Sequence, residues 1–223
     1  EISACLVGSE MCIRDSYKNA SRYFDRVFEL LLKLSVEHAA ELLFWANDNI
    51  YLAYLNSHEG PKTVAFLEKM MDILEHYREM PEVKKDIYQN FEYVYSLYYM
   101  GIAHFPSLVG YEKAYHCLEK TDEMLRKRGE LLTLYFAYEG FYEDAGNYRM
   151  AIAYKDSVIN TMGNENTAIV LAVTSSMYKE QAKCYARLHD YKNAYERMEV
   201  YDSLREKVVL SLIHISEPTR QAE

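Results

Sequence analysis

The chain has 223 residues, of which 50% are hydrophobic and 26% are charged, and its formal net charge is −9. This is the composition of a globular domain or repeat array, and no apolar run reaches the roughly 20 residues that a membrane-spanning helix needs. Glycine (8 copies) and proline (4 copies) are scarce whereas tyrosine is abundant (22 copies), which argues against many-stranded β folds and favours long helices.

The sequence pattern predicts an all-α fold of about nine amphipathic helices. The segments between them, SHEGP, EMPE, FPSLVG, AGN and MGNEN, are rich in residues that end or cap helices. Pro81 fits the first turn of the helix that follows it, where its missing N–H costs nothing. In chain order, the expected helices cover residues 17–34, 36–56, 61–79, 83–105, 110–127, 129–145, 147–161, 167–188 and 190–208.

A Tyr-x-x-Ala motif recurs at the start of four of these segments, as YKNA (twice), YEKA and YRMA. Successive alanines in the last three copies are 37 and 43 residues apart, and the 94-residue gap before them leaves room for one more unit. A small alanine lets one helix approach another closely, and large side chains fill the remaining space. We therefore expect eight residues to pack between helices: Tyr17, Ala20, Tyr111, Ala114, Tyr148, Ala151, Tyr191 and Ala194.

Residues ahead of each alanine extend the motif. Tyr178, Gln181, Ala182 and Tyr185 precede Ala194 with a spacing that resembles the tetratricopeptide pattern W-x2-L-G-x2-Y…A-x3-F. The resemblance covers most of residues 17–209 but is irregular. Glu139 stands where the pattern has a small residue, Lys155 stands where it has an aromatic one, and the spacing exceeds the usual value of about 34 residues.

The tetratricopeptide resemblance implies a right-handed superhelix of antiparallel helix pairs that binds proteins or peptides along its concave face. Each pair cannot bury its apolar face alone and has to stack on a neighbour. The resemblance predicts a non-catalytic segment that interacts with a protein or peptide partner, and we expect neither a nucleic-acid partner nor a cofactor.

The stretches AIAYKDSVIN and YKNAYERMEVYDSLREK are similar to the tetratricopeptide input regions of bacterial membrane-bound sensor kinases and related regulators. That resemblance implies a sensory or scaffold region, which would be periplasmic if the parent protein is such a sensor and cytoplasmic otherwise. Two alternatives remain open: a stand-alone adaptor, and a helical substrate-binding domain of a larger enzyme.

The two ends of the chain are related to each other through DNA. Codons ATA CAC ATC for residues 213–215 have a reverse complement that, one frame over, encodes Met-Cys-Ile, the sequence of residues 11–13. Residues 216–218 and 8–10 correspond in the same way. Both ends resemble a translated sequencing adapter, so residues 1–16 and 210–223 are expected to be adapter-derived, and residues 17–209 to be a helical array truncated at both ends. We expect residues 1 to about 14 and 212 to 223 not to fold.

No motif for catalysis or metal binding stands out. The chain has no H-E-x-x-H, no nucleophile elbow, no C-x-x-C pair and no glycine-rich phosphate loop. Acid pairs such as Asp122-Glu123 fit solvated helix faces, and Cys117 fits a small packed residue better than a reactive thiol. We therefore predict no catalytic, cofactor-binding or metal-binding residues in this segment.

Three cations are the candidate binding residues. Lys179, Lys183 and Arg187 lie four residues apart on one predicted helix and form a single stripe. Within the tetratricopeptide resemblance, this stripe would face the groove and attract an acidic peptide. The alternative is a solvated outer face.

Overall fold

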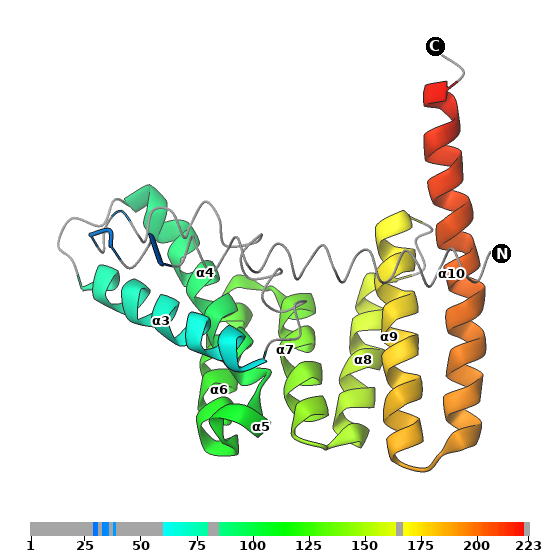
Figure 1. Cartoon of the computed structure of the whole chain (residues 1–223), viewed down its shortest axis with the longest axis horizontal. Coiled ribbons are helices and arrows are strands. Elements are labelled where there is room, and N and C mark those ends of the chain that lie inside the picture. Colours follow the sequence, from blue (N-terminus) through cyan, green and yellow to red (C-terminus); the bar gives the residue numbers. More distant parts are fainter. Residues whose placement is uncertain are drawn as a thin grey trace. The chain divides into compact units, whose positions relative to one another are not determined.

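The computed structural model describes residues 29–30, 33–35, 38, 60–79, 85–163 and 167–220, with the backbone alone at 85–91 and 210–220. Within these ranges every regular element is helical, which confirms the predicted all-α class. The eight helices are α3 (Gly60–Arg78), α4 (Lys85–Ala103), α5 (Pro106–Val109), α6 (Tyr111–Arg128), α7 (Leu131–Asp144), α8 (Tyr148–Met162), α9 (Ala168–Arg187) and α10 (Tyr191–Arg220) (Figure 1).

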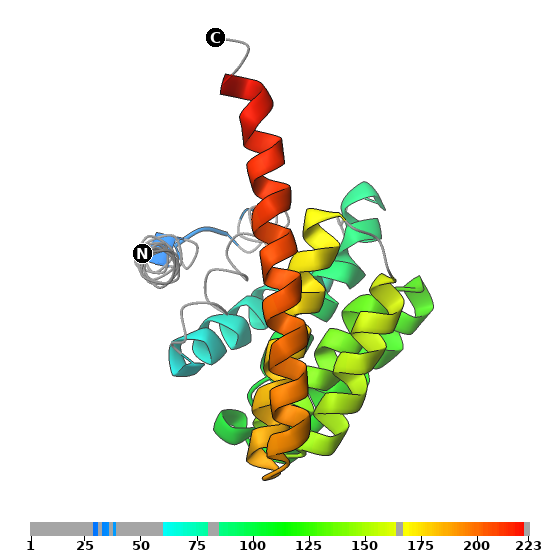
Figure 2. The ribbon, with the colours of Figure 1, turned by 90° about the vertical axis from the view of Figure 1, so that its right-hand side faces the viewer.

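The helices form two compact units, Glu1–Arg128 and Gly129–Glu223, here called unit 1 and unit 2. In unit 1, α4 packs against both α3 and α6, and the short α5 packs against α3 and α6. In unit 2, each helix packs on the next one in the chain, α7 on α8, α8 on α9 and α9 on α10. Figure 2 shows α10 lying along α9 in this second unit.

Local chemistry sets the helix boundaries in unit 2. The Asn147 side chain accepts a hydrogen bond from the Met150 amide at 3.3 Å and caps the start of α8. Thr167 does the same for α9 through the Val170 amide, also at 3.3 Å. Gly146, in the turn that ends α7, has φ +77°, a left-handed conformation that glycine adopts without steric cost. The predicted breaks at AGN and MGNEN fall at these turns.

The bounds of the last seven predicted helices agree with the structure to within a few residues, except at the end of the last one. The segment FPSLVG was predicted as a break, yet Pro106–Val109 form a helical turn, because proline presets the backbone for the first position of a helix. The first two predicted helices, 17–34 and 36–56, lie outside the described residues apart from a few positions.

The end of α10 was predicted wrongly. We expected this helix to stop at 208, but it continues to Arg220 and includes Pro218 (Figure 1). Adding a residue to an existing helix gains one hydrogen bond without a new nucleus, and a proline this close to the end disturbs only the final turn. The adapter resemblance of both ends remains a prediction from the sequence.

The two cores differ in character. The bulkiest fully buried side chains of unit 1 are apolar or aromatic: Tyr95, Tyr98, Leu67, Met70, Leu74, Ile102 and Leu118. In unit 2 the corresponding residues are Phe141 and Lys155. A lysine in a core needs counter-charges, so the surroundings of Lys155 matter to the stability of unit 2.

Candidate functional site

A pocket of about 520 Å³ opens over α4 in unit 1, with α3 and α6 as its walls. Because α4 packs against both neighbours, its side chains form the floor. The lining residues are Glu75 and Arg78 from α3, Glu92, Tyr95 and Tyr99 from α4, and Lys120, Glu123, Met124, Lys127 and Arg128 from α6. Four cations and three acids therefore converge on one site.

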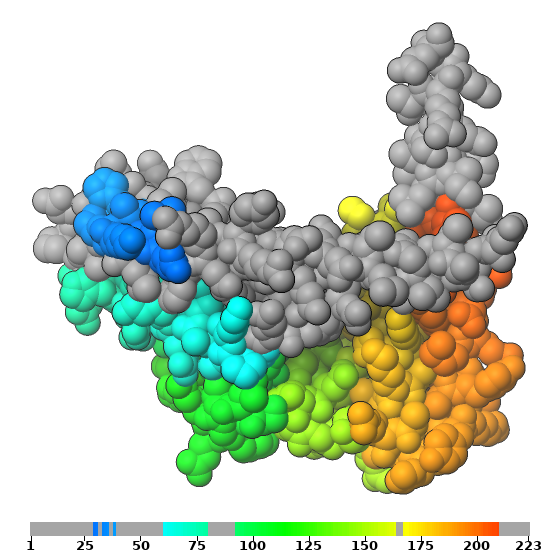
Figure 3. Space-filling model, in the orientation of Figure 1, coloured from blue at the N-terminus to red at the C-terminus, as the bar shows by residue number. Residues whose placement is uncertain are grey.

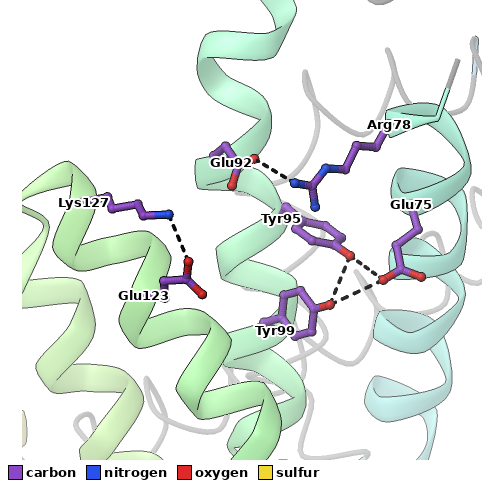
Figure 4. Close-up of polar contacts among 7 residues, drawn as sticks. All are labelled: Glu75, Arg78, Glu92, Tyr95, Tyr99, Glu123 and Lys127. Carbon is purple, nitrogen blue, oxygen red and sulfur yellow. Dashed lines mark hydrogen bonds and ion pairs between the residues drawn. The ribbon is translucent and has the colours of Figure 1, made fainter. Parts of the chain in front are cut away.

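Two buried tyrosines fix the carboxylate of Glu75. The Tyr95 hydroxyl donates to Glu75 Oε1 at 2.5 Å, the Tyr99 hydroxyl donates to the same oxygen at 3.4 Å, and the two hydroxyl oxygens lie 3.1 Å apart (Figure 4). Burial, reinforced by the bond to Glu75, raises the pKa of Tyr95 above its usual range, and burial also raises the pKa of Tyr99. Both hydroxyls therefore keep their protons, and Glu75, itself exposed, is held in one orientation.

Most other charges of the pocket are paired with one another (Figure 4). Arg78 Nη2 lies 3.7 Å from Glu92 Oε1, and Lys127 Nζ lies 3.0 Å from Glu123 Oε1. The hydrogen bond from Lys127 lowers the pKa of the Glu123 carboxyl. Arg128 lies over the ring of Tyr93, at 5.2 Å from its centroid, which is the geometry of a cation–π contact.

Lys120 differs from these cations, because it has no ion-pair partner among the described residues. Seven residues earlier on α6, Lys113 forms an ion pair with Glu68 of α3. Glu75 stands seven residues after Glu68 on α3, so the same pairing would be repeated two turns further along both helices. Instead, Glu75 and Lys120 both line the pocket. The Lys113–Glu68 ion pair therefore joins α6 to α3, whereas two turns further along no ion pair joins Lys120 to Glu75.

The predicted cationic stripe is not a row of free charges. The ammonium group of Lys179 lies 5.5 Å from the ring centroid of Tyr201 on α10, and Lys183 forms an ion pair with Glu180 at 2.7 Å. Lys183 and Arg187 are exposed. The stripe therefore carries less unpaired charge than its sequence suggests.

The repeat motif contributes its alanines more than its tyrosines to packing. Ala114 and Ala151 are fully buried, whereas Ala194 is only partly buried. Tyr111 is 56% exposed and Tyr191 is 66% exposed, and each is the first residue of its helix. Figure 3 shows the first half of α10 (orange) on the surface.

Of the remaining motif residues, Tyr148 is partly buried and packs against the cluster of Ala151, Ile152 and Cys184. The predicted packing residues Tyr17 and Ala20 lie outside the described residues.

Sequence reasoning missed a buried cluster of charges in unit 2. Lys155 of α8 has a side chain that is 1% exposed, and it forms ion pairs with Glu139 and, at 2.7 Å, with Glu143 of α7. The side chain of Glu143 is 35% exposed, so burial applies mainly to the other two residues. We call these three residues the buried triad. Burial would lower the pKa of Lys155, but attraction to both carboxylates outweighs it and raises that pKa. Burial raises the pKa of Glu139.

A glutamine continues the polar contacts towards α9. The Gln181 side-chain nitrogen donates to Asp156 Oδ1 at 2.7 Å and to the Ile152 carbonyl oxygen at 3.3 Å. Its side-chain oxygen is buried and accepts no hydrogen bond within the described part of the chain. These contacts and the buried triad tie α7, α8 and α9 together through polar groups.

No group of three or more histidine, cysteine, aspartate or glutamate side chains in the described residues could hold a metal ion. Nor is any helix among those residues both long enough and apolar enough to cross a bilayer.

Comparison with known proteins gives no match: no protein-family model fits the chain, and no curated protein or solved structure is significantly similar to it.

Proposed function

We propose that this chain is a non-catalytic binding segment, a tetratricopeptide-like superhelix of antiparallel helix pairs that binds a protein or peptide. The pocket over α4 carries the proposal. It is open, its floor contains two fixed tyrosines, and charges of both signs line its walls. Tyrosine and arginine are residues that dominate binding at protein interfaces.

The partner segment is acidic where it meets α6. Lys120, Lys127 and Arg128 lie on that wall, and cations outnumber acids in the pocket although the whole chain has a net charge of −9. Lys183 and Arg187 in unit 2 provide a second, weaker contact for acidic residues. Exposed charges of this kind speed association more than they strengthen the final complex.

The biological setting that we propose is the sensory or scaffold region of a bacterial signalling protein. It rests on the resemblance of the sequence to tetratricopeptide input regions. The alternatives, a stand-alone adaptor and a helical substrate-binding domain of an enzyme, use the same pocket.

The test measures binding of two fluorescent peptide pools, one acidic and one basic, to the full chain by anisotropy at two ionic strengths. We expect the acidic pool to bind more tightly and its affinity to fall with salt, because exposed charges are screened within about 10 Å at 0.1 M. Lys127→Glu should weaken binding most, Lys183→Glu should weaken it less, and Lys192→Glu, whose side chain is 86% exposed, serves as the control.

Two results would overturn the proposal. One is that neither pool binds at either ionic strength. The other is that binding is unchanged in Lys127→Glu and Lys183→Glu, because then neither surface takes part in recognition.

A further inference from the structure

We infer that the pocket over α4 binds a small zwitterion with the charge pattern of a free α-amino acid, its ammonium group on Glu75 and its carboxylate on Lys120. This inference goes beyond peptide binding and does not depend on it. It assigns the pocket a ligand that is complete without a protein partner.

The first argument is the repeated pairing of the two walls. Glu68 of α3 and Lys113 of α6 form a direct ion pair. Seven residues later on both helices, Glu75 and Lys120 present the same two charges to a pocket of about 520 Å³. A ligand with an ammonium group and a carboxylate would give Glu75 and Lys120 an opposite charge each. A ligand with a single charge would pair with only one of them.

The second argument is that Glu75 is already oriented. Its Oε1 accepts hydrogen bonds from Tyr95 and Tyr99, two side chains that are 2% and 9% exposed. Its Oε2 accepts none from the described residues, although a carboxylate oxygen can accept two. A fixed carboxylate loses little conformational freedom when it receives an ammonium group, which favours affinity.

The third argument is elimination among the remaining charges. Arg78 and Glu92 are paired with each other, as are Lys127 and Glu123. Arg128 lies over Tyr93. Glu75 and Lys120 are therefore the two charges of the pocket for which the described residues show neither an ion pair nor a cation–π contact, although the charge of Lys120 also acts on Glu123.

The size of the pocket suits this class of ligand. Small-molecule pockets commonly measure about 300–1,000 Å³. Met124 and the tyrosine rings line the same space and offer a flexible, partly apolar surface to the ligand's side chain.

The experiment titrates the full chain with each of the free amino acids by calorimetry, at concentrations up to about 10 mM. For an amino acid that binds, the N-acetyl and the C-amide derivatives are then tested, since each removes one charge. We expect each derivative to bind at least about tenfold more weakly, the usual loss when a hydrogen bond to a charged group is removed.

Variants locate the site. Glu75→Gln should weaken amino-acid binding at least about tenfold, to about the affinity that the N-acetyl derivative has for the unchanged protein. Lys120→Gln should weaken it as much, to about the affinity of the C-amide derivative. Lys69→Gln is the matched control, because Lys69 lies on α3 and pairs with Asp72 outside the pocket. Urea unfolding of each variant establishes that it is folded.

Three outcomes would overturn the inference: no amino acid binds, the blocked derivatives bind as well as the parent, or the control loses as much affinity as the pocket variants. Peptide binding without amino-acid binding would refute the zwitterion site and leave the proposed function intact. Amino-acid binding without peptide binding would do the reverse.

Discussion

Both units place a lysine–glutamate ion pair between two helices, but they place it in opposite surroundings. In unit 1 the side chains of Lys113 and Glu68 are 53% and 42% exposed. In unit 2 those of Lys155 and Glu139 are 1% and 13% exposed. Exposed pairs contribute about 0–1 kcal/mol, since water already solvates both charges. Removing one partner of a buried pair strands the other charge without water.

The comparison shows that lysine and glutamate pair at the surface in unit 1 and in the core in unit 2. In unit 1, charges remain at the surface, and aromatic residues fill the core beneath a pocket that could take a ligand. In unit 2, charge enters the core and holds two helices together. Breaking each pair in turn measures this difference directly.

The largest effect is expected at Lys155. Lys155→Met leaves Glu139 and Glu143 without their shared cation, and we expect the free energy of unfolding to fall by about 3–5 kcal/mol. Urea unfolding of the full chain measures this loss.

The double variant Lys155→Met, Glu139→Leu is the control. It removes charge from both sides of the pair and should recover most of the loss, because apolar residues of similar volume often replace a buried ion pair without cost. A double variant as unstable as the single one would show that the triad is not a coupled unit.

The buried thiols should give the next largest effect. Burial raises the pKa of Cys117 in unit 1 to about 11 and that of Cys184 in unit 2 to about 12. At pH 8 we expect both thiols to react with a disulfide reagent at least roughly a hundredfold more slowly in the folded than in the unfolded chain, because the thiolate is the reactive form. The measurement uses Cys5→Ser, Cys12→Ser as background.

The same shifts have a consequence for stability. Both folded-state pKa values lie above the unfolded value. The contribution of these thiols to the free energy of unfolding is therefore complete below about pH 9 and is lost as the pH rises through about 11 to 12. Fast labelling at pH 8 without unfolding would contradict the burial of Cys117 and Cys184.

Intermediate effects are expected at the repeat alanines. Ala114→Leu in unit 1 and Ala151→Leu in unit 2 add volume at fully buried positions, and each should cost about 1–3 kcal/mol. Ala194→Leu should cost less, because Ala194 is only partly buried. Thermal and urea unfolding of the three variants would rank them, and equal stability of all three with the parent would remove the packing role.

The smallest effect is expected at the exposed pair. Lys113→Gln should change the free energy of unfolding by less than about 1 kcal/mol, and this change should shrink further in high salt. A loss as large as that of Lys155→Met would show that exposure does not separate the two units in the way proposed here.

Helix positions were largely predictable from the sequence because the signals are local. Asn147, Gly146 and Thr167 end or begin helices through their own side chains or backbone. The errors also have local causes. The turn at Pro106–Val109 is too short for a periodic pattern. The predicted stop at 208 followed from the adapter resemblance of the tail, which does not prevent an existing helix from propagating.

The candidate sites were harder to predict because they join distant residues. The pocket combines residues between Glu75 and Arg128 from three helices, and no single motif contains them. Glu139 and Lys155 were each noted as a departure from the repeat pattern, but they lie on different helices, 16 residues apart. These two departures from the repeat pattern form one ion pair. Two residues of opposite charge that depart from a repeat pattern on successive helices are therefore candidates for a buried ion pair.

The buried triad also bears on how a chain with near-identical motifs avoids assembling in the wrong order. Helices α6, α8 and α10 all begin with Tyr-x-x-Ala, so during folding one of them could dock where another belongs. Docking α8 against a helix other than α7 would bury the ammonium group of Lys155 without its two carboxylates, at a cost of several kcal/mol. The buried Lys155 therefore disfavours docking of α8 against any helix that does not supply carboxylates, and α7 supplies two of them.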